Sequence, residues 1–143
     1  MTVTVYMESL VKARLSKSEQ TSIKENFEQY KNDGSSTVIG VSLGHPFFGK
    51  DEGLTMPPEV RDVLHKVHIK PNSPKQIAKE WIHHISKGRI PVSNHIMIYA
   101  NGIKDPNAYL ILDILRPDGH TKMLDFEHMK RLKALADIFR ESF

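Results

Sequence analysis

The segment that most constrains the fold is an apolar run near the C-terminus. Residues 109–115 read Tyr-Leu-Ile-Leu-Asp-Ile-Leu and precede Arg116-Pro117-Asp118-Gly119-His120. The run has the length of a buried strand, and Pro117 would end it because proline donates no ladder hydrogen bond. Pro-Asp-Gly favours a turn, since proline presets φ and glycine allows positive φ. We therefore expect Arg116 and His120 to flank a tight turn at one end of a sheet.

Hydrophobic periodicity predicts the other elements. Apolar patterns indicate strands at residues 3–7, 63–70, 95–100 and 109–115, the last two forming an antiparallel pair. Helical spacing indicates a short helix within 7–15 and longer helices at 17–33, 77–85 and along the C-terminal segment to Phe143. Residues 34–58, with five glycines and three prolines, favour a loop that includes an extended piece at 38–43. This order predicts an α+β fold, a small antiparallel sheet with an N-terminal helical hairpin and a C-terminal helix, in one domain spanning residues 1–143.

Composition narrows the class of protein. The chain has no cysteine, which excludes disulfides and thiolate chemistry, and no run approaches the ~18 apolar residues that a membrane span needs. The N-terminus lacks the basic and apolar regions of a signal peptide, so we expect a cytoplasmic protein. Residues 1–65 carry a net charge of −2 and residues 66–143 a net charge of +5. The second half is therefore the part that could favour a polyanion.

Several short motifs follow one another along nearly the whole chain: Tyr30–Gly34, Phe48–Asp51, Val67–Ile69, His95–Ile98, Tyr109–His120, Met129, Ala136, Phe139-Arg140 and Phe143. In this order they resemble the YafO family of bacterial type II toxins, within the broader RelE/ParE-like group. The resemblance implies a RelE-like fold and a toxin that acts as a ribosome-associated mRNA endoribonuclease (an mRNA interferase) and inhibits translation. It also implies a cognate antitoxin protein as partner, with the ribosome and mRNA as targets.

Metal-free RNA cleavage needs a base for the ribose 2′-OH, a cation for the charge on the phosphorane, and an acid for the departing 5′-oxygen. We expect His120 to be the general acid or base and Arg116 to clamp the phosphate, since guanidinium binds phosphate bidentately. His68 is the second candidate for proton transfer. Lys66 would share its strand face. The residues predicted to hold the RNA backbone are Lys66, Lys122, Lys130 and Arg140.

Two other interpretations of the sequence stay open. A non-catalytic toxin of the gyrase-inhibitor kind would use the same scaffold as a binding surface, and an RNA- or ribosome-binding module would need no proton-transfer pair. Cofactors and metals are not expected. The adjacent His83 and His84 lack the i, i+4 spacing of a helical metal pair, which argues against a zinc site.

One motif is misleading. Residues 44–50 fit the phosphate-loop pattern G-x-x-x-x-G-K, but the next residue is Asp51 where Ser or Thr should hold magnesium. A carboxylate there would repel phosphate, and the following sequence predicts no helix whose N-terminus could face an anion. We therefore expect Phe47 and Phe48 to pack this segment onto the core or to contact a partner.

Overall fold

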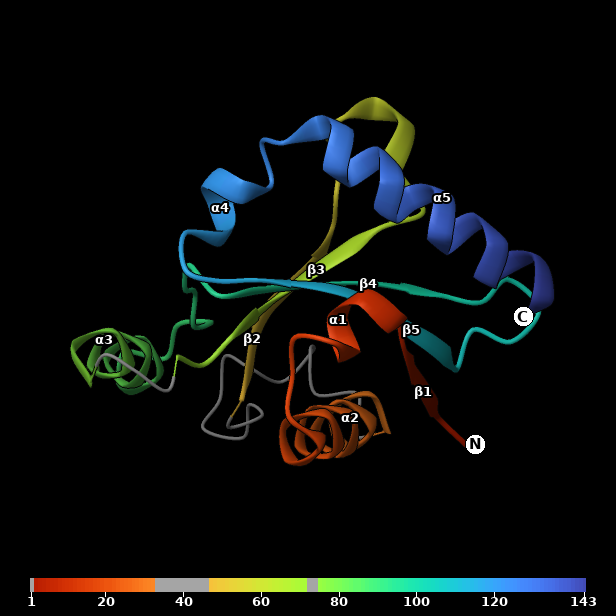
Figure 1. Ribbon diagram of the computed structural model, residues 1–143. Coiled ribbons are helices and arrows are strands. Elements are labelled where there is room, and N and C mark those ends of the chain that lie inside the picture. The colour runs from red at the N-terminus through yellow and green to blue at the C-terminus, as the bar shows by residue number, and fades with distance from the viewer. Residues whose placement is uncertain (1, 33–46, 72–74) are drawn as a thin grey trace.

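The computed structural model describes residues 2–32, 47–71 and 75–143 and confirms the α+β class (Figure 1). The strands are β1 (Thr4–Met7), β2 (Phe48–Gly53), β3 (His65–Ile69), β4 (Ile96–Asn101) and β5 (Ala108–Leu115). The helices are α1 (Ser9–Lys12), α2 (Lys17–Asn32), α3 (Lys75–Ser86), α4 (Gly119–Lys122) and α5 (Phe126–Ser142), with a 3-10 turn at Pro58–Val60. The strands form one sheet in the order β1-β5-β4-β3-β2.

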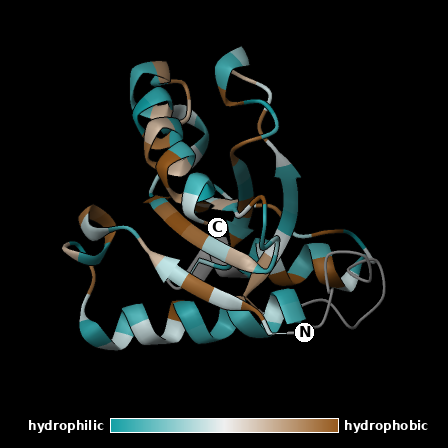
Figure 2. Ribbon diagram, turned by 90° about the vertical axis from the view of Figure 1, so that its right-hand side faces the viewer, coloured by the Kyte–Doolittle hydropathy of each residue, from teal (hydrophilic) through white to brown (hydrophobic). Residues whose placement is uncertain are grey.

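Helices cover both faces of the sheet. Figure 1 shows α4 and α5 on one side and α1 and α2 on the other. Strand alternation sends Ile96 and Ile98 into the core under α5, and Met97 into the core over α2. Figure 2 shows the hydrophobic residues concentrated on the strands, whereas α2 is largely hydrophilic. Burial of apolar surface on both sides of β4 and β5 is therefore what holds the layers together.

The start of α2 has the predicted capping box. The Ser16 side chain accepts from the Glu19 backbone N–H at 3.1 Å, and the Glu19 carboxylate accepts from the Ser16 N–H at the same distance. At the other end, Tyr30 and Lys31 both donate to the Asp51 carboxylate on β2, at 2.8 and 2.9 Å. These contacts fix where α2 begins and tie its last turn to the sheet.

Two predictions about the sheet need correction. The sheet is mixed, because β1 pairs with β5 in parallel; a pairing between the first strand and a distant one leaves no signal in local periodicity. Residues 48–53 form strand β2 rather than a loop, and are paired with β3. The extended piece expected at 38–43 lies outside the described residues. Gly49 and Lys50, the last two residues of the G-x-x-x-x-G-K pattern, belong to β2 and are therefore strand rather than loop.

The turn after β5 exists but is built differently from the prediction. Strand β5 ends at Leu115, before Pro117, as expected. The left-handed residue is Asp118, at φ 57°, whereas Gly119 begins α4. A Cβ on Gly119 would lie 2.7 Å from the backbone oxygen of Asn94, to which the Gly119 N–H donates at 2.7 Å. Glycine is thus required by the close approach of α4 to the segment before β4.

Across the described ranges, no helix combines the length and the apolar character needed to cross a lipid bilayer.

Candidate active-site groove

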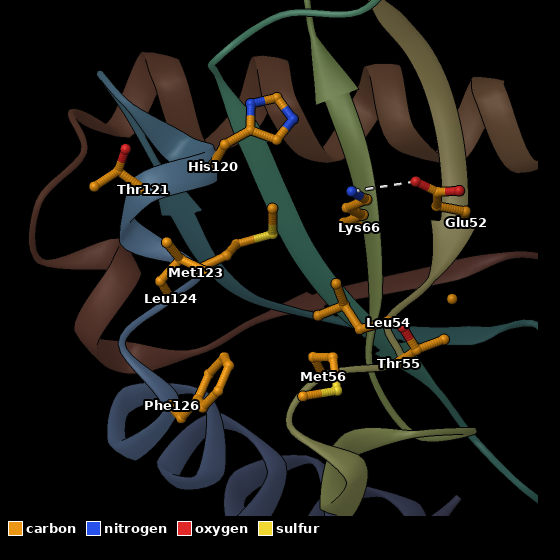
Figure 3. Close-up of a pocket in the computed structure, with 11 residues that line it drawn as sticks. Glu52, Leu54, Thr55, Met56, Lys66, His120, Thr121, Met123, Leu124 and Phe126 are labelled. Carbon is orange, nitrogen blue, oxygen red and sulfur yellow. Dashed lines mark ion pairs between the residues drawn. The ribbon is translucent and has the colours of Figure 1, made fainter.

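A groove of about 540 Å³ lies between the β2–β3 edge of the sheet and the segment that carries α4 and the start of α5. Figure 3 shows His120 on one wall and Lys66 and Glu52 on the other. The lining residues are Glu52, Gly53, Leu54, Thr55, Met56, Lys66, His120, Thr121, Met123, Leu124 and Phe126. The groove therefore lies on the α5 side of the sheet, beside the strands that α5 leaves uncovered.

Lys66 and His68 share this side of β3, as the sequence predicted. Val67, between them, is buried in the core on the opposite side. The Lys66 ammonium pairs with Glu52 across the β2–β3 ladder, with Nζ and Oε1 3.1 Å apart. The Lys66 side chain is 17% exposed and that of Glu52 41% exposed. Lys66 is thus a partly buried cation held at the groove wall by a more accessible carboxylate.

His120 lies in α4 with its ring directed across the groove (Figure 3). Its Nδ1 donates to the side-chain oxygen of Asn94 at 2.5 Å. Because that oxygen can only accept, the proton of the neutral ring sits on Nδ1 and the lone pair on Nε2. Desolvation, and secondarily the charge of Lys66, lower the pKa of His120 below its usual 6.5. The imidazole is therefore neutral at neutral pH and presents a proton-accepting nitrogen.

His68 lies behind His120 and is only 2% exposed. The two ring centroids are 5.3 Å apart, and the planes are inclined by 45°. The Nδ1 of His68 lies 2.9 Å from the backbone nitrogen and 2.8 Å from the backbone oxygen of Ser93, so this atom has a partner in either tautomer. Burial is the main reason that the pKa of His68 is lowered to about 4, and the charges of protonated His120 and of Lys66 lower it further. His68 is thus a neutral, buried ring that packs beside His120 and is not open to the groove.

The backbone before β4 positions both histidines. Ser93 contacts His68, the Asn94 side chain contacts His120, and the Asn94 carbonyl accepts from the first residue of α4. The Ser93 hydroxyl in turn donates to the Ile69 carbonyl at 2.8 Å. One short connection therefore fixes the strand and the helix that carry the two imidazoles.

Comparison with known proteins identifies the family of the chain that forms this groove. The family model described as toxin YafO of type II toxin–antitoxin systems matches residues 28–141. The chain belongs to the YafO toxin family. Membership of a type II toxin–antitoxin family implies that the protein has a cognate antitoxin as partner, as the resemblance indicated. Searches of curated proteins and of solved structures gave no significant match.

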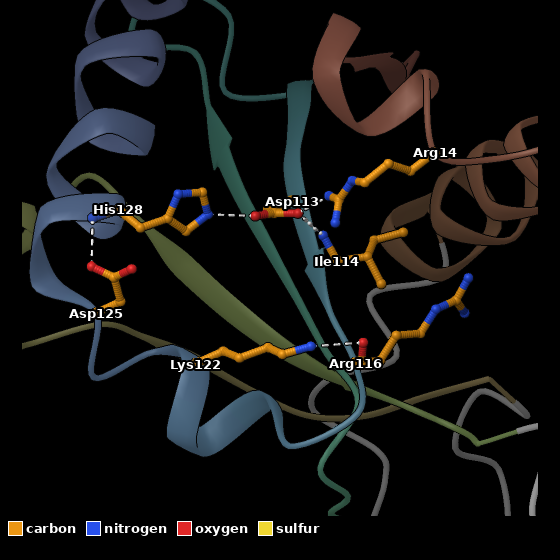
Figure 4. A network of polar contacts seen from close by, with 7 residues as sticks. All are labelled: Arg14, Asp113, Ile114, Arg116, Lys122, Asp125 and His128. Carbon is orange, nitrogen blue, oxygen red and sulfur yellow. Dashed lines mark hydrogen bonds and ion pairs between the residues drawn. The ribbon is translucent and has the colours of Figure 1, made fainter.

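The structure does not bring Arg116 together with His120 in this YafO-family toxin. The Arg116 guanidinium lies 3.4 Å from the Glu19 carboxylate and lines a separate cavity of about 250 Å³ beside α2. Figure 4 shows its side chain directed toward the N-terminal helices. The reason is the alternation of β5: Leu115 enters the core under α5, so the next residue points to the other side. The turn that joins the two residues in sequence separates their side chains in space.

The other predicted RNA contacts also lie outside the groove. Lys122 donates to the Arg116 carbonyl at 3.0 Å, and Arg140 donates to the Asn101 carbonyl at 3.2 Å. Lys130 pairs with Glu59 at 3.3 Å, and this contact raises its pKa. Of the four lysines and arginines expected to hold the RNA backbone, Lys66 alone lines the groove of the YafO-family toxin.

Sequence reasoning missed Glu52 and Asn94. Glu52 lies in a segment that the sequence predicts to be a loop. Its position opposite Lys66 follows only from the pairing of β2 with β3. Asn94 is an unremarkable polar residue before a strand, and only the approach of α4 gives it His120 as a partner. Where the structure describes the chain, it contains no group of three or more His, Asp or Glu residues placed to hold a metal ion.

Proposed function

We propose that this toxin is an endoribonuclease that cleaves translated mRNA on the ribosome and so inhibits translation. The observation that carries the proposal is the placement of His120 Nε2 and the Lys66 ammonium on opposite walls of one open groove. A neutral imidazole and a fixed cation are two of the groups that metal-free cleavage of a phosphodiester needs. The basic second half of the chain suits a polyanionic substrate.

In the proposed reaction His120 is the general base. Its Nε2 takes the proton of the ribose 2′-OH, and the 2′-oxygen attacks the adjacent phosphorus. The bond from phosphorus to the 5′-oxygen then breaks, which leaves a 2′,3′-cyclic phosphate on one fragment and a 5′-hydroxyl on the other. The lowered pKa of His120 supports this role, because the ring is already unprotonated at neutral pH.

Lys66 supplies the positive charge. Its ammonium would stabilise the negative charge that grows on the phosphorane, and it would give a proton to the departing 5′-oxygen. The ion pair with Glu52 holds the ammonium at the groove wall before substrate arrives. Such preorganisation matters because charge stabilisation is most effective when no reorientation is needed at the moment of reaction.

His68 is a positioning residue in this proposal. It is buried and does not line the groove, but its ring packs beside that of His120. Its neutral state keeps a second positive charge away from His120, which would otherwise lower the pKa of the base further. Arg116 is left outside the catalytic group because its guanidinium pairs with Glu19 on the other side of the sheet.

The test is primer extension on cellular mRNA after induced expression of wild-type toxin and single variants. We expect wild-type toxin to produce new 5′ ends within translated regions, and His120→Ala and Lys66→Met to produce about 10²-fold fewer at equal protein level. His83→Ala, which changes an exposed histidine on α3, is the matched control and should cleave as the wild type does. Intact mRNA under growth arrest, with inhibition of gyrase supercoiling by purified toxin, would instead assign the chain to the non-catalytic class.

A further inference from the structure

The groove has two chemically different ends. Glu52, Lys66 and His120 make a polar end, whereas the other end is formed by the apolar side chains Leu54, Met56, Met123, Leu124 and Phe126 (Figure 3). Leu54 and Met123 belong to the core under α5 and form the inner wall. Met56 is 54% exposed and Leu124 70% exposed, so both present apolar surface to solvent inside a concavity.

Burial does not explain the exposed part of this wall. Single exposed apolar residues are common on protein surfaces, but here several converge from the segment after β2 and the segment between α4 and α5. A concave apolar wall with a few charged groups at one end is the usual form of a site for a ligand with an apolar part and a charged part. A nucleotide has that form, since the base offers a flat apolar face and the phosphate a negative charge.

We propose that the apolar end of the groove binds the nucleobase next to the scissile phosphate, in single-stranded RNA. The inference rests on the proposed function, because the phosphate is placed between His120 and Lys66. The groove, of about 540 Å³, has room for a nucleotide. A base reaches the apolar wall only when it is turned out of any stack, which favours unpaired RNA.

The lining also determines which property of the base is read. Besides Glu52, Lys66 and His120 of the polar end, the polar side chains among the lining residues are the hydroxyls of Thr55 and Thr121. Apolar contact with the face of a base tolerates every base, but it grows with the area of the ring system. The site accordingly selects purines over pyrimidines by contact area and demands no single base.

The methionines allow a direct test by NMR. Toxin labelled with ¹³C in the methionine methyl groups is titrated with a 2′-O-methyl adenosine dinucleotide, which cannot be cleaved, and with two analogues that each lack one base. We expect the Met56 and Met123 methyl signals to shift with the intact dinucleotide. Of the two analogues, only the one that keeps the base docked at the apolar wall should shift them. The methyl signals of Met7 and Met97, which are buried on the α2 side of the sheet, are internal controls and should stay in place. Unmoved Met56 and Met123 signals at millimolar dinucleotide would overturn the inference.

A variant pair adds a measurement of affinity. Leu124→Ser should weaken binding of the dinucleotide by roughly tenfold and leave binding of the analogue that lacks the docked base unchanged. Ile138→Ser, at a residue of α5 that is 65% exposed, is the matched control and should bind both ligands as the wild type does. Equal loss of affinity for both ligands in Leu124→Ser would overturn the base site. Methyl shifts without any mRNA cleavage would reject the nuclease and leave the base site standing, whereas cleavage without methyl shifts would reject the base site alone.

Discussion

His68 and His120 lie with their ring centroids 5.3 Å apart, one on a buried strand and the other on an exposed helical turn. Each ring has a different partner in the same short connection, Ser93 for His68 and Asn94 for His120. The exposed ring is therefore oriented by the segment that also holds the buried one. We therefore expect changes around the exposed His120 to alter activity and changes at the buried His68 to alter stability.

The first prediction concerns the tautomer of His120. Asn94→Ala removes the oxygen that accepts from Nδ1, so the ring is free to rotate and to carry its proton on Nε2 instead. We expect kcat for RNA cleavage to fall by about 10²-fold with little change in KM, because misorientation affects the chemical step. Asn26→Ala on α2 serves as control. A double variant, Asn94→Ala with His120→Ala, should be no slower than His120→Ala alone; additive losses would contradict the assigned role.

The second prediction concerns pH. Desolvation and the charge of Lys66 lower the pKa of His120 below 6.5. A base acts in its unprotonated form, so the cleavage rate should rise as pH increases through that lowered pKa and level off near neutrality. In Lys66→Met the positive neighbour is gone, and the pKa of His120, followed by the NMR signal of its ring, should move upward toward 6.5. A rate that falls with rising pH over the same range would make His120 the acid.

The third prediction concerns stability in acid. Burial lowers the pKa of His68 to about 4 in the folded protein, while the unfolded chain has the ordinary value near 6.5. Between these values the unfolded state binds the proton that the folded state refuses, so folding stability falls as pH decreases from 6.5 toward 4. The full contribution is roughly 3 kcal/mol. Urea unfolding at pH 7 and pH 4 measures how much free energy of unfolding each protein loses on acidification. This loss should be smaller by about that amount in His68→Gln than in the wild type; identical losses in the two proteins would be evidence against the assignment.

The fourth prediction concerns Asp113, a buried carboxylate on β5. Asp113, whose side chain is 7% exposed, accepts from His128 at 2.6 Å and pairs with Arg14 (Figure 4). His128→Ala leaves one carboxylate oxygen without this partner and should lower the free energy of unfolding by about 1–3 kcal/mol. Lys133→Ala breaks a partly exposed pair with Asp137 and should change the free energy of unfolding by less than about 0.5 kcal/mol. Equal effects would mean that the Asp113 contacts contribute little.

Much of the fold could be predicted because periodicity is local. The pattern of Tyr109–Leu115 and the capping box at Ser16 each predicted an element that the structure confirms. Strand β2 could not be predicted, since Phe48–Gly53 contains two glycines and three charged residues and is a strand only through its pairing with β3. The parallel pairing of β1 with β5 depends on residues far apart in the chain in the same way.

The site shows the same limit. The common face of Lys66 and His68 follows from the period of a strand and was predicted correctly. Arg116 points toward α2 after β5 ends, whereas α4 carries His120 to the groove on the α5 side. The sequence of the turn does not encode these two directions. Glu52 and Asn94 acquire their roles only when β2 and α4 are placed. The sequence thus left undetermined which residues of different elements come into contact.

The central claim is best tested by the chemistry of the cleaved ends. Purified toxin is mixed with ribosomes translating a defined mRNA, and the fragments are analysed by mass spectrometry, with a matched mRNA carrying a 2′-deoxynucleotide at the main cleavage site. We predict 2′,3′-cyclic phosphate and 5′-hydroxyl ends from wild-type toxin, no cleavage at the 2′-deoxy position, and a loss of about 10²-fold or more in His120→Ala. Undiminished cleavage by His120→Ala, or cleavage at the 2′-deoxy position, would contradict the account.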